Sequence, residues 1–252
     1  MDQAIDSSMT HLPLLEASGI SDPGRVRPNN EDSFLLLPHL GLAAVADGMG
    51  GAAAGEVASS IFVDSAKRII TAPAPDAAQA SELIKRVYIE ANHQIMEYAA
   101  AHPEAKGLGC TAELLLFHPS GYCLGHVGDS RTYLLRNGTL KRLTKDHTVV
   151  QDQLDQGLIT PEEARKHPMR NVILRAVGVN EVLAVDIIKG MFIPADTFLL
   201  CSDGLSDMID DTQIHEIMSR RLAPAEMARL LVERANQAGG KDNVTAVIVK
   251  VE

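Results

Sequence analysis

The sequence predicts an α+β fold in which helices pack outside antiparallel sheets. Short links such as Pro119-Ser120-Gly121 and Asn137-Gly138 join successive strand candidates, and they favour antiparallel neighbours because parallel strands need long crossovers. Strands are followed by amphipathic helices twice along the chain, which is typical of layered α+β domains. The 252 residues show no repeat at fixed spacing and no low-complexity linker. We therefore expect a single domain over residues 14–252, after a flexible leader of residues 1–13.

The N-terminal half is predicted to contain three strands and then two helices. Short apolar runs predict the strands at residues 14–20, 34–37 and 42–46. Between the first two strands, Ser21-Asp22-Pro23-Gly24 is typical of a turn, and a polar loop follows it. Apolar side chains then recur every three or four residues, which predicts amphipathic helices over 58–69 and 80–98, divided by Pro73 and Pro75.

The C-terminal half repeats this order with one interruption. Strands are expected at residues 111–117, 122–127, 132–135, 182–188, 197–201 and 244–249, and helices at 212–221 and 224–237. Between residues 145 and 178 the apolar alternation stops, and two polar helical pieces are expected at 149–154 and 161–166. Thr160 is placed to cap the second piece. This segment is expected to lie over the sheet.

Composition excludes several classes of protein. A formal charge of −10 without any Lys/Arg cluster argues against a nucleic-acid or anionic-membrane partner, because both require a basic face. Apolar runs fall well short of the ~18 to 20 residues that a membrane-spanning helix needs. The N-terminus carries acids where a signal peptide has basic residues, and three cysteines lie in apolar runs without metal-site spacing. We expect buried thiols in a cytoplasmic protein that is a monomer.

One stretch organises the chain chemically: the apolar run over residues 43–46 ends on Asp47-Gly48. An Asp-Gly pair is also a strong hairpin signal, but here a helical pattern follows instead of a second alternating strand. A functional site is therefore favoured over a turn alone. The same pattern, an apolar run that ends on aspartate beside glycine, returns at Asp129 and at Asp203.

Five acids share this placement at or just before strand ends: Glu31, Asp47, Asp129, Asp203 and Asp242. Any one of them alone is more simply interpreted as a solvated turn carboxylate. Together they would repel one another unless cations lay among them, and oxygen ligands favour Mg²⁺ or Mn²⁺. Two such ions about 3.5 to 4 Å apart can activate a shared water for attack on phosphorus. Arg27 would supply the fork that binds phosphate oxygens. The sequence contains no Gly-x-x-x-x-Gly-Lys-Ser/Thr loop, His-Glu-x-x-His or Gly-x-Ser-x-Gly motif.

These residues lie in six ordered motifs: Gly24-Arg25-Val26-Arg27-Pro28-Asn29-Asn30-Glu31-Asp32, Val45-Ala46-Asp47-Gly48-Met49-Gly50-Gly51, Gly109-Cys110-Thr111-Ala112, Val127-Gly128-Asp129-Ser130-Arg131, Ser202-Asp203-Gly204-Leu205 and Asp242-Asn243-Val244-Thr245. In this series the chain resembles the metal-dependent protein phosphatases, the PPM or protein phosphatase 2C-like family, of the bacterial serine/threonine type. The resemblance covers about residues 18–249.

The resemblance implies a four-layer α-β-β-α sandwich with metal ions at one end, two Mn²⁺ or Mg²⁺, with a position for a third as in bacterial members. It implies that Asp47 bridges two ions, that Glu31 and the Gly48 carbonyl hold one, and that Asp203 and Asp242 hold the other. Asp129, with Asp203, matches the position that binds a third ion. Arg27 matches the phosphate-binding arginine, and Asp32 resembles an acid that orders metal-bound water. Residues 145–178 correspond to the flap of the family.

The implied activity is hydrolysis of phosphoserine and phosphothreonine in proteins by in-line attack of a metal-bridging hydroxide, opposing a bacterial protein kinase. Met49 departs from eukaryotic members, which place a histidine there as the proposed general acid. A metal-bound water is our first choice for that role, with His147 or His167 as weaker options. Two alternatives stay open: a non-catalytic scaffold or phosphopeptide-binding module of the same fold, and a phosphohydrolase acting on small esters.

Overall fold

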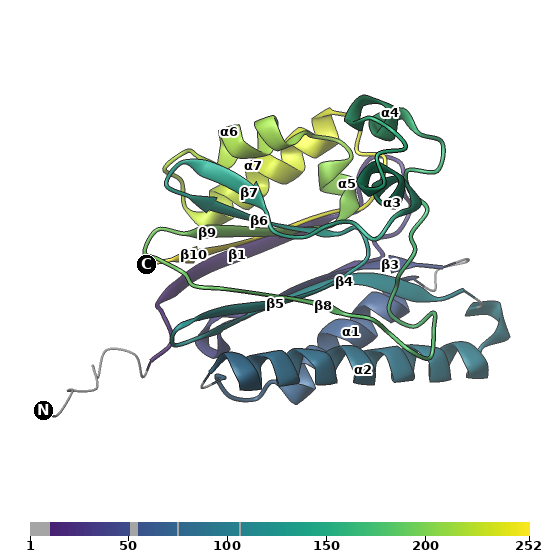
Figure 1. The fold of residues 1–252 in the computed structure, drawn as a ribbon, viewed down its shortest axis with the longest axis horizontal. Coiled ribbons are helices and arrows are strands. Elements are labelled where there is room, and N and C mark those ends of the chain that lie inside the picture. The colour runs from purple at the N-terminus through teal and green to yellow at the C-terminus, as the bar shows by residue number, and fades with distance from the viewer. Residues whose placement is uncertain (1–10, 51–54, 75, 106) are drawn as a thin grey trace, which may run out of the picture.

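Two five-stranded sheets face each other in the computed structural model, which describes residues 11–50, 55–74, 76–105 and 107–252 (Figure 1). Helices cover both outer faces, so the predicted four-layer sandwich is confirmed, and every strand pair is antiparallel. Residues 1–10 of the predicted leader lie outside the described residues. No helix in the described ranges is both long and apolar enough to cross a bilayer.

The first sheet has the strand order β1-β10-β9-β6-β7 and the second has the order β2-β3-β4-β5-β8. The first sheet consists of β1 (Leu15–Asp22), β10 (Val244–Val251), β9 (Thr197–Cys201), β6 (Arg131–Arg136) and β7 (Thr139–Arg142). The second consists of β2 (Asp32–Leu37), β3 (Leu42–Met49), β4 (Gly109–His118), β5 (Gly121–Val127) and β8 (Asp186–Gly190). Neighbours in the first sheet come from both ends of the chain, so its assembly requires long-range contacts.

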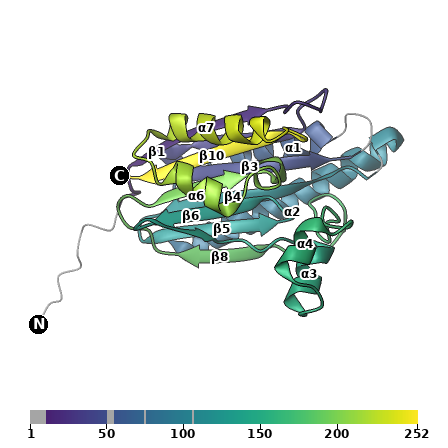
Figure 2. The ribbon, with the colours of Figure 1, turned by 90° about the horizontal axis from the view of Figure 1, so that it is seen from above.

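The helices divide between the two outer faces. The second sheet is covered by α1 (Gly55–Ile69) and α2 (Ala77–Ala101), and the 3₁₀ helices η2 (Pro38–Leu40) and η3 (Pro103–Ala105) flank strands of that sheet. The first sheet is covered by α6 (Asp211–Met218) and α7 (Pro224–Gln237), and Figure 2 shows α7 crossing β1 and β10. A short helix, α5 (Asp203–Ser206), follows β9 directly. Asp76 caps α2 by accepting hydrogen bonds from the Ala78 and Gln79 amides.

Three apolar layers hold the sandwich together, one between the sheets and one beneath each helical face. Successive residues of β3 show how one strand serves two layers. Ala43 and Val45 belong to the layer between the sheets, whereas Ala44 and Ala46 pack toward α1 and α2. A strand buried on both faces reads as a continuous apolar run, which is why residues 43–46 lack alternation.

The structure differs from the predicted elements at three places. The strand predicted over 182–188 begins only at Asp186, because its partner residue there, His126, is next to the last residue of β5. Val182 is 88% exposed instead of paired. The strand β7 and the helix α5 were not predicted, since each has only four residues and carries little periodicity. Cys110, Cys123 and Cys201 are buried free thiols, as expected.

Residues 145–178 contain α3 (Val149–Asp155) and α4 (Pro161–Lys166), close to the expected helical pieces. Thr160 forms a capping box with Glu163, as its sequence position predicts. The segment is joined to the rest of the fold near its two ends: the His147 amide donates to the Gly128 carbonyl, and Cys110 and Val177 exchange two backbone hydrogen bonds. Its two helices pack against each other beside α5 (Figure 1).

Candidate functional site

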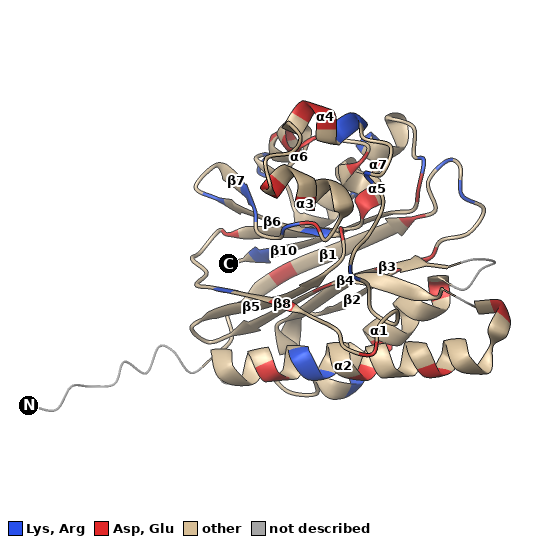
Figure 3. Cartoon of the chain, turned by 45° about the vertical axis from the view of Figure 1, so that its right-hand side comes forward, with Lys and Arg blue, Asp and Glu red and all other residues tan. Residues whose placement is uncertain are grey.

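The predicted site residues come together at one end of the sandwich, where strands of both sheets end. Asp32 and Asp47 are direct partners on β2 and β3. Asp129 follows β5, Asp203 follows β9, and Asp242 lies two residues before β10. Figure 3 shows acidic segments gathered where the strands end beneath α5. Strand pairing therefore brings together acids that are up to 210 residues apart, from Asp32 to Asp242.

These carboxylates lie in an environment that disfavours their charge. Asp32 and Asp129 are 8% and 7% exposed, and Asp47 and Asp203 are half-buried. Desolvation raises the pKa of Asp32 to about 6 and that of Asp129 to about 7. Desolvation, together with the neighbouring acids, raises the pKa of Asp47 and of Asp203 well above the usual range. A cation placed among them would relieve this repulsion.

Asp32 is held between the two sheets. Its Oδ2 atom accepts hydrogen bonds from the Ser202 hydroxyl at 2.7 Å and from the Thr245 hydroxyl at 2.6 Å. Its Oδ1 atom is buried and has no hydrogen-bond partner in the described part of the chain. A buried carboxylate oxygen without a donor can accept a bond from a group outside the protein. This orphaned oxygen fits the expected role of Asp32 in ordering water.

Glu31 and Gly48 meet at the beginning of α1. The Gly48 amide donates to the Glu31 carbonyl at 3.1 Å. A Cβ atom added at Gly55 would lie 2.6 Å from Glu31 Oε2 and 2.8 Å from the carbonyl carbon of Gly48. Only glycine therefore allows the Glu31 carboxylate and the Gly48 carbonyl to approach this closely. Two predicted oxygen ligands are thus neighbours.

The loop that carries Arg27 is tied to the loop before β10. The Asn243 side chain donates to the carbonyls of Pro23 and Asn29 and accepts from the Glu31 amide at 2.8 Å. Arg27 Nη2 lies 2.7 Å from Asp242 Oδ2, and the two side chains are 52% and 36% exposed. The hydrogen bond to Asp242 raises the pKa of Arg27. The predicted phosphate-binding arginine is thus placed beside a predicted metal ligand.

Three residues that position these acids were not predicted from the sequence: Ser202, Thr245 and Asn243. Each lies within three positions of a predicted ligand in the motifs. Their side chains join Asp32 and Glu31 to the opposite sheet or loop. Short polar side chains beside aspartate at strand ends are the only local signal for them.

The acids gather without forming a complete set of metal ligands in the described part of the chain. Within the described ranges, no three His, Cys, Asp or Glu side chains stand close enough to hold an ion as they are. Asp242 instead turns to Arg27. Carboxylates without a cation repel one another, and Mg²⁺ retains several waters, so its protein ligands need not be in contact. An all-oxygen donor set, mutual repulsion and the orphaned Asp32 oxygen fit a hard divalent cation.

His147 is engaged in the structure and does not fit a general acid. Its Nδ1 atom accepts a bond from the Gly128 amide at 3.1 Å, and its Nε2 atom lies 3.3 Å from Asp186 Oδ2. Burial lowers the pKa of His147 to about 4, so the ring is neutral near pH 7. His167 directly follows α4, and its Nδ1 atom accepts a hydrogen bond from the Met169 amide. Neither contact places a proton at the carboxylate cluster.

Comparison with known proteins gives a consistent set of matches. The sequence model of the protein phosphatase 2C family matches residues 27–238. The serine/threonine phosphatase stp of Listeria welshimeri is 38% identical over 237 residues, which are 91% of this chain and 93% of that protein. The crystal structure of the Mycobacterium tuberculosis serine/threonine phosphatase PstP/Ppp is 41% identical, with a TM-score of 0.88 over 94% of this chain and 99% of that one. The PstP catalytic domain in complex with two manganese ions has a TM-score of 0.85 at 40% identity, over 94% of this chain and 98% of that one.

Proposed function

The chain belongs to the protein phosphatase 2C family, and from this premise we propose how its own residues carry out the reaction. It is a metal-dependent serine/threonine phosphatase, as its named relatives are. The observation that carries our proposal is the convergence of carboxylates from both sheets beside Arg27. A phosphate ester is dianionic, so an acidic site can bind it only when cations and a guanidinium supply the positive charge.

We assign the metal ligands around Asp47, which lies between the other acids. Glu31 and the Gly48 carbonyl would hold an ion on one side, since both contact the space at Gly55. Asp203 and Asp242 would hold an ion on the other side, and Asp129 with Asp203 a third. The effect of Asp129 and Asp242 on the pKa of Asp203 supports this grouping. When bound, Mn²⁺ or Mg²⁺ supplies Lewis-acid activation of water and of the phosphate group.

Arg27 and Asp32 are assigned to the substrate and to the attacking water. Arg27 would exchange its bond to Asp242 for two bonds to phosphate oxygens, which its planar fork favours. The Oδ1 atom of Asp32 would accept a hydrogen bond from the water, while Ser202 and Thr245 hold Oδ2. Attack in line forms a bond from the water oxygen to phosphorus and breaks the bond to the serine or threonine oxygen. The products are the free hydroxyl and inorganic phosphate.

The cellular setting follows from the same chemistry. We infer that phosphorylated proteins are the substrates and that a serine/threonine kinase makes them, which is a signalling role. The buried free thiols agree with a reducing compartment, the cytoplasm. We further propose that the protein acts as a monomer and that residues 145–178 form a flap beside the site.

The decisive experiment uses chelator-treated protein and a phosphothreonine peptide, with and without Mn²⁺. We expect hydrolysis only with Mn²⁺, and loss of hydrolysis in Asp203→Asn, because an amide cannot replace an anionic ligand. The matched control is Asp64→Asn, an exposed aspartate on α1, which should keep full activity. Calorimetry with Mn²⁺ separates the alternatives. Ion binding without hydrolysis in the unmutated protein would favour the scaffold, and full activity of Asp203→Asn would contradict the ligand assignment.

A further inference from the structure

An apolar groove of about 460 Å³ lies at the C-terminal end of α2, away from the carboxylates. It is bounded by α2, η3, the residues before β4 and the end of the 145–178 segment. The residues of its lining that the structure describes are all uncharged: Met96, Ala99, Ala100, Pro103, Gly107, Leu108, Gly178 and Val179. Val179 is 46% exposed in it. Volumes of about 300–1,000 Å³ with apolar walls are typical of ligand pockets.

The groove is held open by specific hydrogen bonds. Asn92 of α2 accepts the Gly178 amide at 2.7 Å and donates to the Asn180 carbonyl at 2.9 Å. Gly178 packs so closely on α2 that an added Cβ would lie 2.1 Å from Ile95 Cγ2. The next residue, Val179, therefore has a fixed position relative to α2, and the groove is formed without a partner.

Gly109 brings the groove next to Met49, which lies two residues after Asp47. Gly109, directly after the groove residue Leu108, pairs with Met49 across β3 and β4. A Cβ at Gly109 would lie 2.9 Å from Val179 Cγ2 and 3.6 Å from Met49 Cε. Met49 in turn follows Asp47-Gly48. Met49 and the groove residue Val179 thus both lie against Gly109.

We propose that this groove binds an apolar side chain of the phosphoprotein substrate, close in sequence to the phosphorylated residue. The inference rests on the proposed phosphatase function and adds a specificity site to it. The apolar side chains of the described lining, Met96, Leu108 and Val179 among them, fit leucine, methionine or phenylalanine better than a charged residue, which would lose its hydration against them. Met49 then has a role at the substrate path, in addition to leaving the general-acid position without a histidine.

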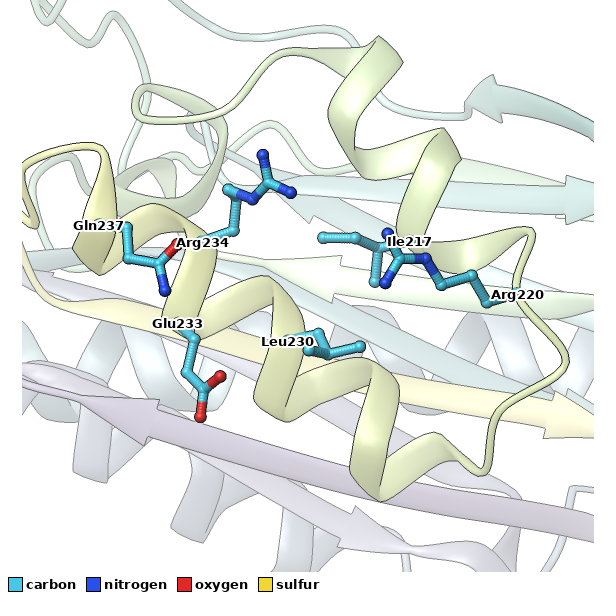
Figure 4. Close-up of a pocket in the computed structure, with 6 residues that line it drawn as sticks. All are labelled: Ile217, Arg220, Leu230, Glu233, Arg234 and Gln237. Atoms are coloured by element: carbon cyan, nitrogen blue, oxygen red, sulfur yellow. The ribbon is translucent and has the colours of Figure 1, made fainter.

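A second depression, of about 110 Å³, does not carry a similar argument. It lies between α6 and α7, on the opposite outer face, and the charged side chains of Arg220, Glu233 and Arg234 contribute to its lining (Figure 4). Nothing connects it with the carboxylate end.

The test measures kcat/KM for phosphothreonine peptides in which one leucine is moved through flanking serine positions. At one position we expect leucine to raise kcat/KM about tenfold over serine, the gain from burying most of one leucine side chain. Ala100→Trp should fill the groove and abolish this preference. The matched control is Ala101→Trp, the next residue of α2, which is exposed and does not line the groove. Hydrolysis of p-nitrophenyl phosphate, which is too small to reach the groove, should be unchanged in both variants.

The outcomes separate the two proposals. Loss of the leucine preference in Ala100→Trp, with p-nitrophenyl phosphate turnover intact, would support the groove as a substrate site. A preference that survives Ala100→Trp, or a wild-type enzyme that shows none, would overturn it. A groove that instead joins two copies of the chain would show as a shift in sedimentation on Ala100→Trp without any change in peptide preference. Absence of hydrolysis of every substrate in the presence of Mn²⁺ would contradict the proposed function itself, and with it this inference.

Discussion

Two buried carboxylates illustrate how single neighbours decide what a residue does. Among the residues that the structure describes, Asp32 has hydroxyl donors at one oxygen and no hydrogen-bond partner at the other. Glu113 is also fully buried, but both of its oxygens are bonded: Oε1 to the His126 ring and Oε2 to the Thr132 hydroxyl. The acid with a free oxygen can serve the reaction, whereas the satisfied acid holds strands together.

The Arg27 side chain is assigned to binding of the phosphate group. Arg27→Ala should raise the inhibition constant of inorganic phosphate about tenfold or more, because it removes charge-assisted hydrogen bonds worth about 1.5–3 kcal/mol. Product-inhibition kinetics with Mn²⁺ present measure this constant. Arg25→Ala, in the same loop and exposed, should leave it unchanged. Equal phosphate inhibition in wild type and Arg27→Ala would remove Arg27 from the phosphate site.

The Glu113–His126 pair gives a second prediction, on pH. Burial lowers the pKa of His126, but the Glu113 carboxylate outweighs it, so the pKa is raised; burial also raises the pKa of Glu113. Groups with raised folded-state pKa values stabilise below their unfolded values, and this contribution is lost as pH rises through the folded values. The loss begins at about pH 4.3 for Glu113 and at about pH 6.5 for His126, so urea unfolding should show stability falling from about pH 4.3 upward with a further fall above about pH 6.5.

Glu113→Gln isolates this effect. The glutamine amide can donate to His126 Nδ1 while its oxygen accepts from Thr132, and His126 Nε2 keeps the Lys145 carbonyl at 2.8 Å. The part of the pH dependence of the unfolding free energy that is due to this pair should disappear. The substitution itself should lower the unfolding free energy by about 1 kcal/mol or less. Glu113→Ala removes the hydrogen-bond partner of both His126 and Thr132 and should lower the unfolding free energy by about 3 kcal/mol. An unchanged pH slope in Glu113→Gln would show that the pair does not carry it.

At the scale of elements, the ends of the 145–178 segment matter more than its helices. Near its start, the His147 amide donates a hydrogen bond to the Gly128 carbonyl, and the His147 Nδ1 atom accepts a hydrogen bond from the Gly128 amide. Gly128 directly precedes Asp129, so the segment begins against a predicted metal ligand. Near its end, Val177 pairs with Cys110, and Gly178 is held by Asn92 of α2. The segment is thus fixed to the second sheet and its helices on both sides.

Asn92→Ala tests the attachment at the C-terminal end. The substitution leaves the buried Gly178 amide without an acceptor, which costs about 2 kcal/mol. Native-state hydrogen exchange at Gly178 should become faster by about 30-fold, the same free energy expressed as a rate ratio. Gln94→Ala, which removes a side chain that donates to Glu90 on the same helix, should leave Gly178 exchange as in wild type. Unchanged exchange in Asn92→Ala would mean that other contacts hold this end.

At the scale of the whole molecule, the site exists only when the two sheets have closed on each other. Asp32 comes from the second sheet, while its partners Ser202 and Thr245 lie 170 and 213 residues further on, at the ends of the inner strands β9 and β10 of the first. Aromatic packing between the sheets, such as the edge-to-face pair Phe117–Phe198 at 5.4 Å, supports the same closure. Catalytic geometry and global stability are therefore coupled here.

Thr245→Val tests this coupling. It keeps the shape but removes the hydroxyl bonded to Asp32, so we expect a loss of about 1.5–3 kcal/mol in unfolding free energy together with a lower kcat. Thr139→Val, on the exposed start of β7, is the matched control and should cost about 0.5 kcal/mol or less. In a double-mutant cycle with Ser202→Ala, additive effects would show that the two hydroxyls do not act together on Asp32.

The amino-acid sequence alone was enough to predict the fold class, most helices and strands, and the acids and arginine that we assign to the site. These features depend on short stretches of sequence. The spacing of apolar residues over a few helical turns or strand residues predicts each element, and an apolar run that ends on Asp47 or Asp203 indicates the end of a strand. The assigned roles of Glu31, Asp129 and Asp242 stay predictions until the variants are measured. Elements with little local signal, such as β7 and the true start of β8, were missed.

Which of these groups are in contact depends on the folded arrangement of strands and loops. The bonds of Asp32 to Ser202 and Thr245, the pairing of Glu113 with His126, and the approach of Glu31 to Gly48 and Gly55 all depend on which strands and loops become neighbours. The groove beside Met49 likewise forms where α2, β4 and the end of the 145–178 segment converge. Long-range pairing has no signature within a short window, because the contact energy arises only after the intervening chain has folded back.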